Sequence, residues 1–60
     1  MIYLTDEEIQ KRLQEVYNTY VASQNQLTPA IPALSEAFRG ALMGIVVCAE
    51  ALGVNIEEVN

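Results

Sequence analysis

Apolar residues recur with helical spacing along the first part of the chain. Ile9, Leu13, Val16 and Tyr20 follow one another at steps of four, three and four residues. Such steps place side chains on one face of an α-helix. Thr5 precedes three acidic residues and forms a capping box with Glu8. The pattern therefore predicts an amphipathic helix over residues 5–24, whose apolar stripe is widened by Tyr17 and Val21.

A more apolar run fills the second half of the chain. From Gly40 to Leu52 it carries one charge, Glu50. Its main stripe, again at steps of four and three, consists of Leu34, Phe38, Ala41, Ile45, Cys48 and Leu52. Beside this stripe lies a row of small residues, namely Ala33, Ala37, Gly40, Gly44 and Ala51. Gly53 supplies the left-handed residue that ends many helices, so the pattern predicts a second helix over residues 32–52.

A polar segment with two prolines joins the two predicted helices. Residues 23–26 have a weak helical tendency, and Pro29 and Pro32 cannot both lie inside a helix. We therefore expect a turn within residues 25–31, with Leu27 and Ile31 closing the end of the core. A connection this short makes the helices antiparallel neighbours. The predicted fold is all-α: one helical-hairpin domain over residues 1–60, with a short C-terminal turn at residues 55–58.

The nearly uncharged second helix predicts self-association. Helices that are apolar all round are buried on all sides, and 60 residues are too few to surround one. The chain has no histidine and one cysteine, so neither a histidine-ligated zinc nor an intrachain disulfide can stabilise it. We expect a homo-oligomeric helical bundle with the second helices inside. The expected interface consists of Ala37, Gly40, Ala41, Gly44, Ile45, Val47, Cys48 and Ala51.

Two glycines four residues apart stand inside the second predicted helix. Gly40 and Gly44 each cost about 1 kcal/mol relative to alanine. A helix tolerates this cost where another backbone approaches closely. Two interpretations stay open: a tight crossing with another helix, or room for Tyr17 or Tyr20 within the hairpin.

The charge balance limits the classes of partner. Eight acidic residues against three basic ones give a net charge of −5. Too few cations are present to neutralise nucleic-acid phosphates, so no DNA partner is expected. No membrane partner is expected either, because anionic lipid surfaces attract basic proteins and the apolar run is too short for a span. The acidic start of the chain lacks the basic region of a signal peptide. A free thiol, Cys48, is typical of the cytosol, so we expect a cytoplasmic protein.

Arg39 is the single cation of the second helix. With a turn near residue 28, it lies opposite the part of the first helix that contains Tyr17 and Tyr20. One interpretation is structural: the guanidinium stacks on a tyrosine or pairs with Glu36. The other is a site for a small anionic ligand or nucleotide, in which Arg39 binds phosphate and Tyr17 or Tyr20 stacks on a base.

The segment from Ala49 to Val59 resembles the end of the MazG-type all-α nucleotide pyrophosphohydrolases, in which a helix ends in a leucine–glycine pair followed by an acidic turn. The resemblance covers about 11 residues. The family's metal site is a Glu-Glu-x-x-Glu motif with a later Glu-x-x-Asp. Here Glu7 and Glu8 are followed by Lys11, and Glu36 is followed by Arg39 where the aspartate belongs. The resemblance therefore implies no activity.

These features favour binding over catalysis. No arrangement of catalytic or metal-ligating residues stands out, so no enzyme activity, cofactor or metal is expected. We expect a small acidic binding module, an inhibitor or regulatory adaptor, that acts as a homo-oligomer on another protein. Small cofactor-free proteins of this kind are common among virus-encoded, phage-like inhibitors, which is an analogy of class. Two alternatives stay open: an oligomer that holds a small ligand between protomers, and a purely structural oligomerisation unit.

Overall fold

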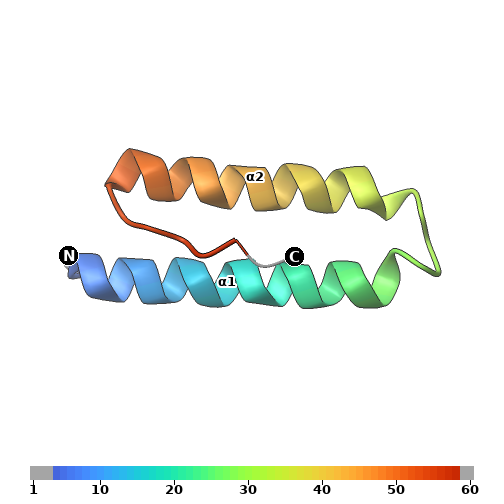
Figure 1. Ribbon diagram of the computed structural model, residues 1–60, viewed down its shortest axis with the longest axis horizontal. Helices are drawn as coiled ribbons and strands as arrows, with labels where there is room; N and C mark the ends of the chain where they lie inside the picture. The colour runs from blue at the N-terminus through green and yellow to red at the C-terminus, as the bar shows by residue number, and fades with distance from the viewer. Residues whose placement is uncertain (1–3, 59–60) are drawn as a thin grey trace.

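The computed structural model describes residues 4–58, which form an antiparallel helical hairpin (Figure 1). Helix α1 spans Asp6–Leu27 and helix α2 spans Leu34–Leu52. A six-residue connection joins them at one end of the molecule, and after α2 the chain turns back and runs along α1. The predicted all-α hairpin is confirmed.

Helix α1 begins at the predicted cap. Thr5 has an extended backbone, and its Oγ1 accepts a hydrogen bond from the Glu8 amide at 3.2 Å. This bond satisfies one of the amides that have no partner within the first turn. Asp6 and Glu7 lie beside the positive end of the helix dipole. Within residues 4–58 the reverse bond of the capping box, from Glu8 to the Thr5 amide, is not formed.

Helix α1 ends three residues later than predicted. The polar segment at residues 23–26 continues the helix, and the Thr28 amide still donates to the Gln24 carbonyl at 2.9 Å. Polarity alone does not break a helix, whereas Pro29 lacks the amide that the next turn requires. The turn therefore lies at residues 28–33 rather than 25–31, and α2 begins two residues after the predicted start.

Helix α2 ends as predicted, at Gly53. This glycine has φ 74°, and its amide donates to the Glu50 carbonyl at 3.1 Å, while the Val54 amide donates to the Ala49 carbonyl at 3.0 Å. The pair of bonds is a Schellman motif, which closes a helix and reverses the chain. The predicted helical turn at residues 55–58 is wrong, because this segment forms no helix. The side chain of Gln14 pairs with the backbone of Glu57 instead.

The core of the hairpin is small. Among residues 4–58, only Tyr17, Val21 and Ala49 are buried. The predicted stripe of α2 is correct as far as Ile45, but Ala49 then becomes the buried residue while Cys48 and Leu52 stay exposed. A repeat of steps of four and three drifts around a helix of 3.6 residues per turn, which explains the change. Leu27 and Ile31 do not close the core, because both are more than 40% exposed.

The hydroxyl of Thr28 provides a test of the packing at the end of α1. Its Oγ1 is buried and has no hydrogen-bond partner among residues 4–58. Removing an unpaired buried hydroxyl without changing the side-chain shape costs nothing. We expect Thr28→Val to leave the free energy of unfolding unchanged or to raise it by up to about 1 kcal/mol, measured by thermal and urea unfolding at one fixed chain concentration.

Thr19→Val is the matched control for this substitution. The Thr19 hydroxyl is exposed and donates to the Glu15 carbonyl at 2.9 Å. The same exchange there removes a bond that is made, so it should lower the free energy of unfolding slightly. A loss of more than about 1 kcal/mol at Thr28 would mean that its hydroxyl has a partner.

Candidate functional site

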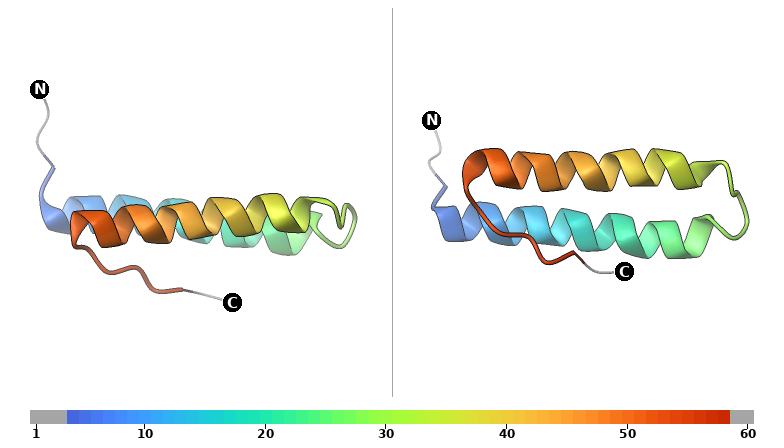
Figure 2. Two further views of the ribbon diagram at one scale, coloured as in Figure 1. Left: turned by 90° about the horizontal axis from the view of Figure 1, so that it is seen from above. Right: turned by 45° about the horizontal axis from the view of Figure 1, so that its top comes forward.

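The two sides of the hairpin differ in what covers them. Seen from above, the segment after Gly53 lies on one side of the layer formed by α1 and α2 (Figure 2). We call residues 54–58 the tail, and the side on which they lie the tail side. The opposite side, which the tail leaves uncovered, we call the open face. Each side has a hollow lined by both helices.

The open face is apolar. Its hollow is lined by Val16, Tyr20 and Leu27 of α1 and by Phe38 of α2, with polar residues at the rim. Tyr20 packs edge-on against Phe38, with ring centroids 6.4 Å apart. Helical spacing extends the face along both helices, through Ile9, Leu13, Ala41, Ile45, Cys48 and Leu52. Val16, Tyr20, Leu27 and Leu52 are each 40–54% exposed, so this face lacks a partner among the described residues.

The row of small residues on α2 continues the open face outward. Ala37, Gly40, Gly44 and Ala51 are all exposed, as are Val47 and Cys48. An added Cβ at Gly40 or Gly44 would meet no atom within 4 Å. The hairpin therefore needs neither glycine to make room for Tyr17 or Tyr20. The eight residues expected at an oligomer interface lie on or beside the open face, six of them exposed and two, Ala41 and Ile45, half-buried.

The charges of α2 are confined to one strip. Glu36, Arg39 and Glu50 fall on the same side of the helix, because their spacings are close to whole numbers of turns. That strip lies on the side of α2 away from the open face. The remainder of the α2 circumference, including the small-residue row, is uncharged.

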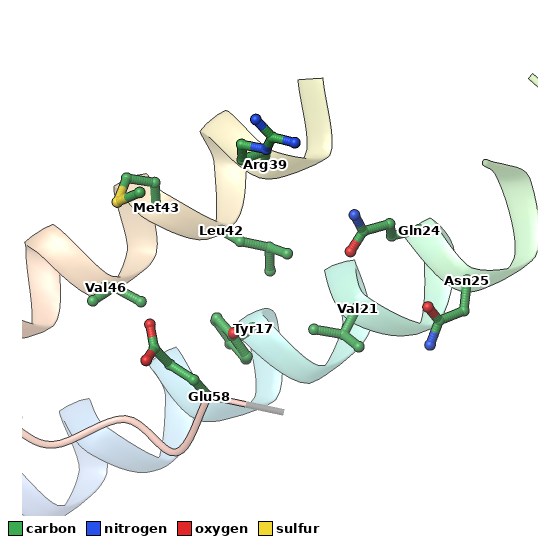
Figure 3. A pocket seen from close by; sticks show the side chains of 9 residues that line it. All are labelled: Tyr17, Val21, Gln24, Asn25, Arg39, Leu42, Met43, Val46 and Glu58. Carbon is green, nitrogen blue, oxygen red and sulfur yellow. The ribbon is translucent and has the colours of Figure 1, made fainter. Parts of the chain in front are cut away.

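On the tail side, Tyr17 and Arg39 line one hollow of about 270 Å³ (Figure 3). Leu42 of α2 points toward Tyr17 and Val21, which lie side by side on α1, whereas the guanidinium of Arg39 turns outward. Arg39 forms no ion pair among residues 4–58, so it does not pair with Glu36. The structure thus places two of the three candidate ligand-binding residues together.

Tyr20, the third candidate, lies in the hollow of the open face instead. Tyr17 is only 5% exposed, so little of its ring is free to stack on a base. The volume of the Tyr17–Arg39 hollow is slightly below the range of about 300–1,000 Å³ typical of small-molecule pockets. One protomer alone therefore offers a place for an anionic group near Arg39 rather than a complete nucleotide site.

A pair of hydrogen bonds that sequence reasoning missed holds the tail. The Gln14 carboxamide accepts from the Glu57 amide at 2.8 Å and donates to the Glu57 carbonyl at 3.0 Å. Its nitrogen also donates to Asn18 Oδ1 at 3.0 Å, which fixes its orientation. On a solvated helix face a glutamine is unremarkable in sequence, so no pattern pointed to this contact.

No group of three or more His, Cys, Asp or Glu side chains in the described part of the chain is placed to hold a metal ion. Neither α1 nor α2 combines the length and the apolar character needed to cross a bilayer. No protein-family model, curated protein or solved structure matches the chain.

Arg39 tests the hypothesis of an anionic ligand. If the protein binds a nucleotide or another phosphate compound, Arg39→Glu should weaken that binding roughly thirtyfold or more, the effect of removing a charged hydrogen bond. Arg12→Glu makes the same change of charge on α1, away from the Tyr17–Arg39 hollow, and should have little effect. Calorimetry with a panel of nucleotides measures both. If the parent protein gives no heat with any nucleotide, the protein is not a nucleotide binder.

Proposed function

We propose that the protein is a small acidic binding module, an inhibitor or regulatory adaptor, that acts as a homo-oligomer. The observation that carries this proposal is the open face, on which large apolar side chains of both helices are exposed together. Apolar patches of about 300–600 Å² are the largest that a typical monomer exposes, and they are often functional. A second copy that packs its own open face on the first buries both.

The dimensions of the open face suit a dimer. A helix of 19 residues is about 28 Å long, and two adjacent helices are roughly 20 Å wide. Treated as a flat rectangle, the face measures on the order of 560 Å² per chain, so a pair of chains buries about 1,100 Å². The uneven surface of the side chains adds to this area. Specific interfaces begin at about 1,000–1,200 Å².

The distribution of charge favours self-association through this face. Each chain has a net charge of −5, so two copies repel one another wherever their acidic surfaces meet. The small-residue row carries no charge, and the hollow of the open face has one acidic residue, Glu15, at its rim. Contact through these surfaces therefore keeps most carboxylates of the two copies apart. In such a dimer the acidic residues point outward, where they can contact a basic surface of a partner protein.

The mass of the native protein tests the proposal directly. Light scattering on a sizing column at micromolar concentration should give at least twice the chain mass of 6.6 kDa. Native mass spectrometry of protein purified from cells then separates the function classes. A co-purifying protein supports the adaptor, a co-purifying small molecule supports the ligand binder, and a clean homo-oligomer supports the structural unit. A well-folded monomer would contradict all homo-oligomeric forms of the proposal.

Substitution of Gly44 has opposite expected effects in a monomeric hairpin and in a dimer. In the single chain, Gly44→Leu meets no atom at its Cβ and should stabilise α2 by about 0.8 kcal/mol through helix propensity. In a dimer that brings a second backbone close, the same change overpacks the crossing at a cost of about 1–3 kcal/mol. We expect the dissociation constant of the dimer to rise about tenfold or more, measured by analytical ultracentrifugation.

Glu50→Leu is the control for this variant, because it places the same side chain on the charged strip of α2. Its dissociation constant should stay within about threefold of the parent. Unchanged association of the Gly44 variant, together with a higher melting temperature, would mean that no second backbone approaches the small-residue row.

The ligand-binding alternative has one observation in its favour, namely the shared hollow of Tyr17 and Arg39. Because this hollow is small and open, a complete site would need walls from a second protomer. We therefore place this function second to the adaptor.

A further inference from the structure

The tail is held through its backbone. Both hydrogen bonds from Gln14 go to the amide and carbonyl of Glu57, and none involves the Glu57 side chain. A carboxamide that pairs with both backbone groups of one residue acts as the edge of a β-strand would. Such recognition depends on the path of the chain and not on its sequence.

Side chains of the tail alternate between the helices and solvent. Val54 and Ile56 are half-buried, whereas Asn55 and Glu57 are exposed. Alternation with a period of two is characteristic of an extended chain that lies on a surface. We call the surface under the tail the groove: it runs from the depression at Asp6 and Glu7, past Gln14, to the hollow of Tyr17 and Arg39. The groove therefore favours apolar residues at two positions separated by one residue.

The charges at one end of the groove do not match the tail, whereas those at the other end do. At the first end Asn55 lines an open depression together with Asp6 and Glu7, so an uncharged residue borders two acidic ones. At the other end Glu58 and Arg39 line the same hollow with opposite charges, although the guanidinium of Arg39 turns outward. A chain with a basic residue at the position of Asn55 would suit the first end better.

We propose that the groove under the tail is a binding site for an extended peptide of a partner protein, and that the tail is its built-in competitor. The partner segment has an apolar residue, a lysine or arginine, a second apolar residue, any residue, and then an acidic residue. Its backbone takes the place of Glu57 on the Gln14 carboxamide. Beyond the bond from the Val54 amide to Ala49, two hydrogen bonds and two half-buried side chains hold the described part of the tail, so we expect a competing peptide to displace it.

This site rests on the proposed function in that it supplies the contact of a binding module with its partner. It does not depend on self-association, since the tail and the open face lie on opposite sides of the hairpin (Figure 2). An experiment that disproves the peptide site therefore does not disprove self-association, and the reverse also holds.

Labelled peptides and the full-length chain test the proposal. The probes are synthetic copies of residues 53–58, one unsubstituted, one carrying Asn55→Lys and one carrying Asn55→Glu. Fluorescence anisotropy should rank them with the lysine copy tightest and the glutamate copy weakest. Binding of the lysine copy should accelerate hydrogen exchange at the Glu57 amide of the protein, since the tail leaves Gln14. Light scattering during the titration follows the assembly separately.

Gln14→Leu removes both backbone hydrogen bonds and leaves a somewhat shorter apolar side chain. It takes the contact from the tail and from the peptide alike, so hydrogen exchange at the Glu57 amide should be fast in the free variant, and the lysine copy should not accelerate it further. Gln10→Leu, which borders the depression without bonding Glu57, should behave as the parent protein does. Should the Gln14 variant fail to fold, the carboxamide resonances of Gln14 in the parent protein report the same contact. If the Gln14 carboxamide resonances do not shift when the lysine copy is added, the proposal is overturned. An unsubstituted copy that binds as tightly as the lysine copy also overturns it, and indicates exchange of tails between copies.

Discussion

Two helices share a single interface, and this constraint governs the rest of the structure. Each helix of a hairpin can bury only the side that faces its neighbour, so most apolar positions of a strongly apolar chain stay outside the core. Within residues 4–58 the buried residues are Tyr17, Val21 and Ala49, although 52% of the chain is hydrophobic. A domain of this size is marginally stable unless something else covers its surface. Two sides of the hairpin, the tail side and the open face, therefore remain to be covered.

The chain covers one of these sides itself. The Schellman motif at Gly53 reverses the chain, and Gln14 then fixes the tail along α1. The described part of the tail makes few bonds, so the cover is thin. A thin cover is compatible with the proposed peptide site, at which the tail is displaced. The open face has no such cover among residues 4–58.

The sequence predicted the elements of the fold well, since these depend on local signals. Thr5 and Gly53 act within a few residues of their own positions, and both helix ends that they define are correct. The turn lies later than the polar segment predicts, because polar residues do not break a helix and Pro29 is the first residue that cannot continue it. The contact of Gln14 with Glu57 joins residues 43 positions apart, and no local pattern encodes such a contact. Local patterns also do not show that Tyr17 and Tyr20 lie on different sides of the hairpin, because a small rotation of α1 about its axis decides which side Tyr20 faces.

Packing within a single hairpin does not explain why α2 contains Gly40 and Gly44. Together, Gly40 and Gly44 cost about 2 kcal/mol of helix stability relative to alanine, a large amount for a hairpin with three buried residues. Neither position has a turn, a positive φ or a neighbouring atom that an alanine would strike. Within one hairpin, glycine at these positions therefore gives no packing advantage that would offset its lower helix propensity. In the proposed homo-oligomer a second backbone at the small-residue row supplies one, because close approach of helices gains dispersion contacts along their whole length. The same energetic argument favours a proposed partner beside α2, where the circumference is largely uncharged, over one beside the charged outer surface of α1.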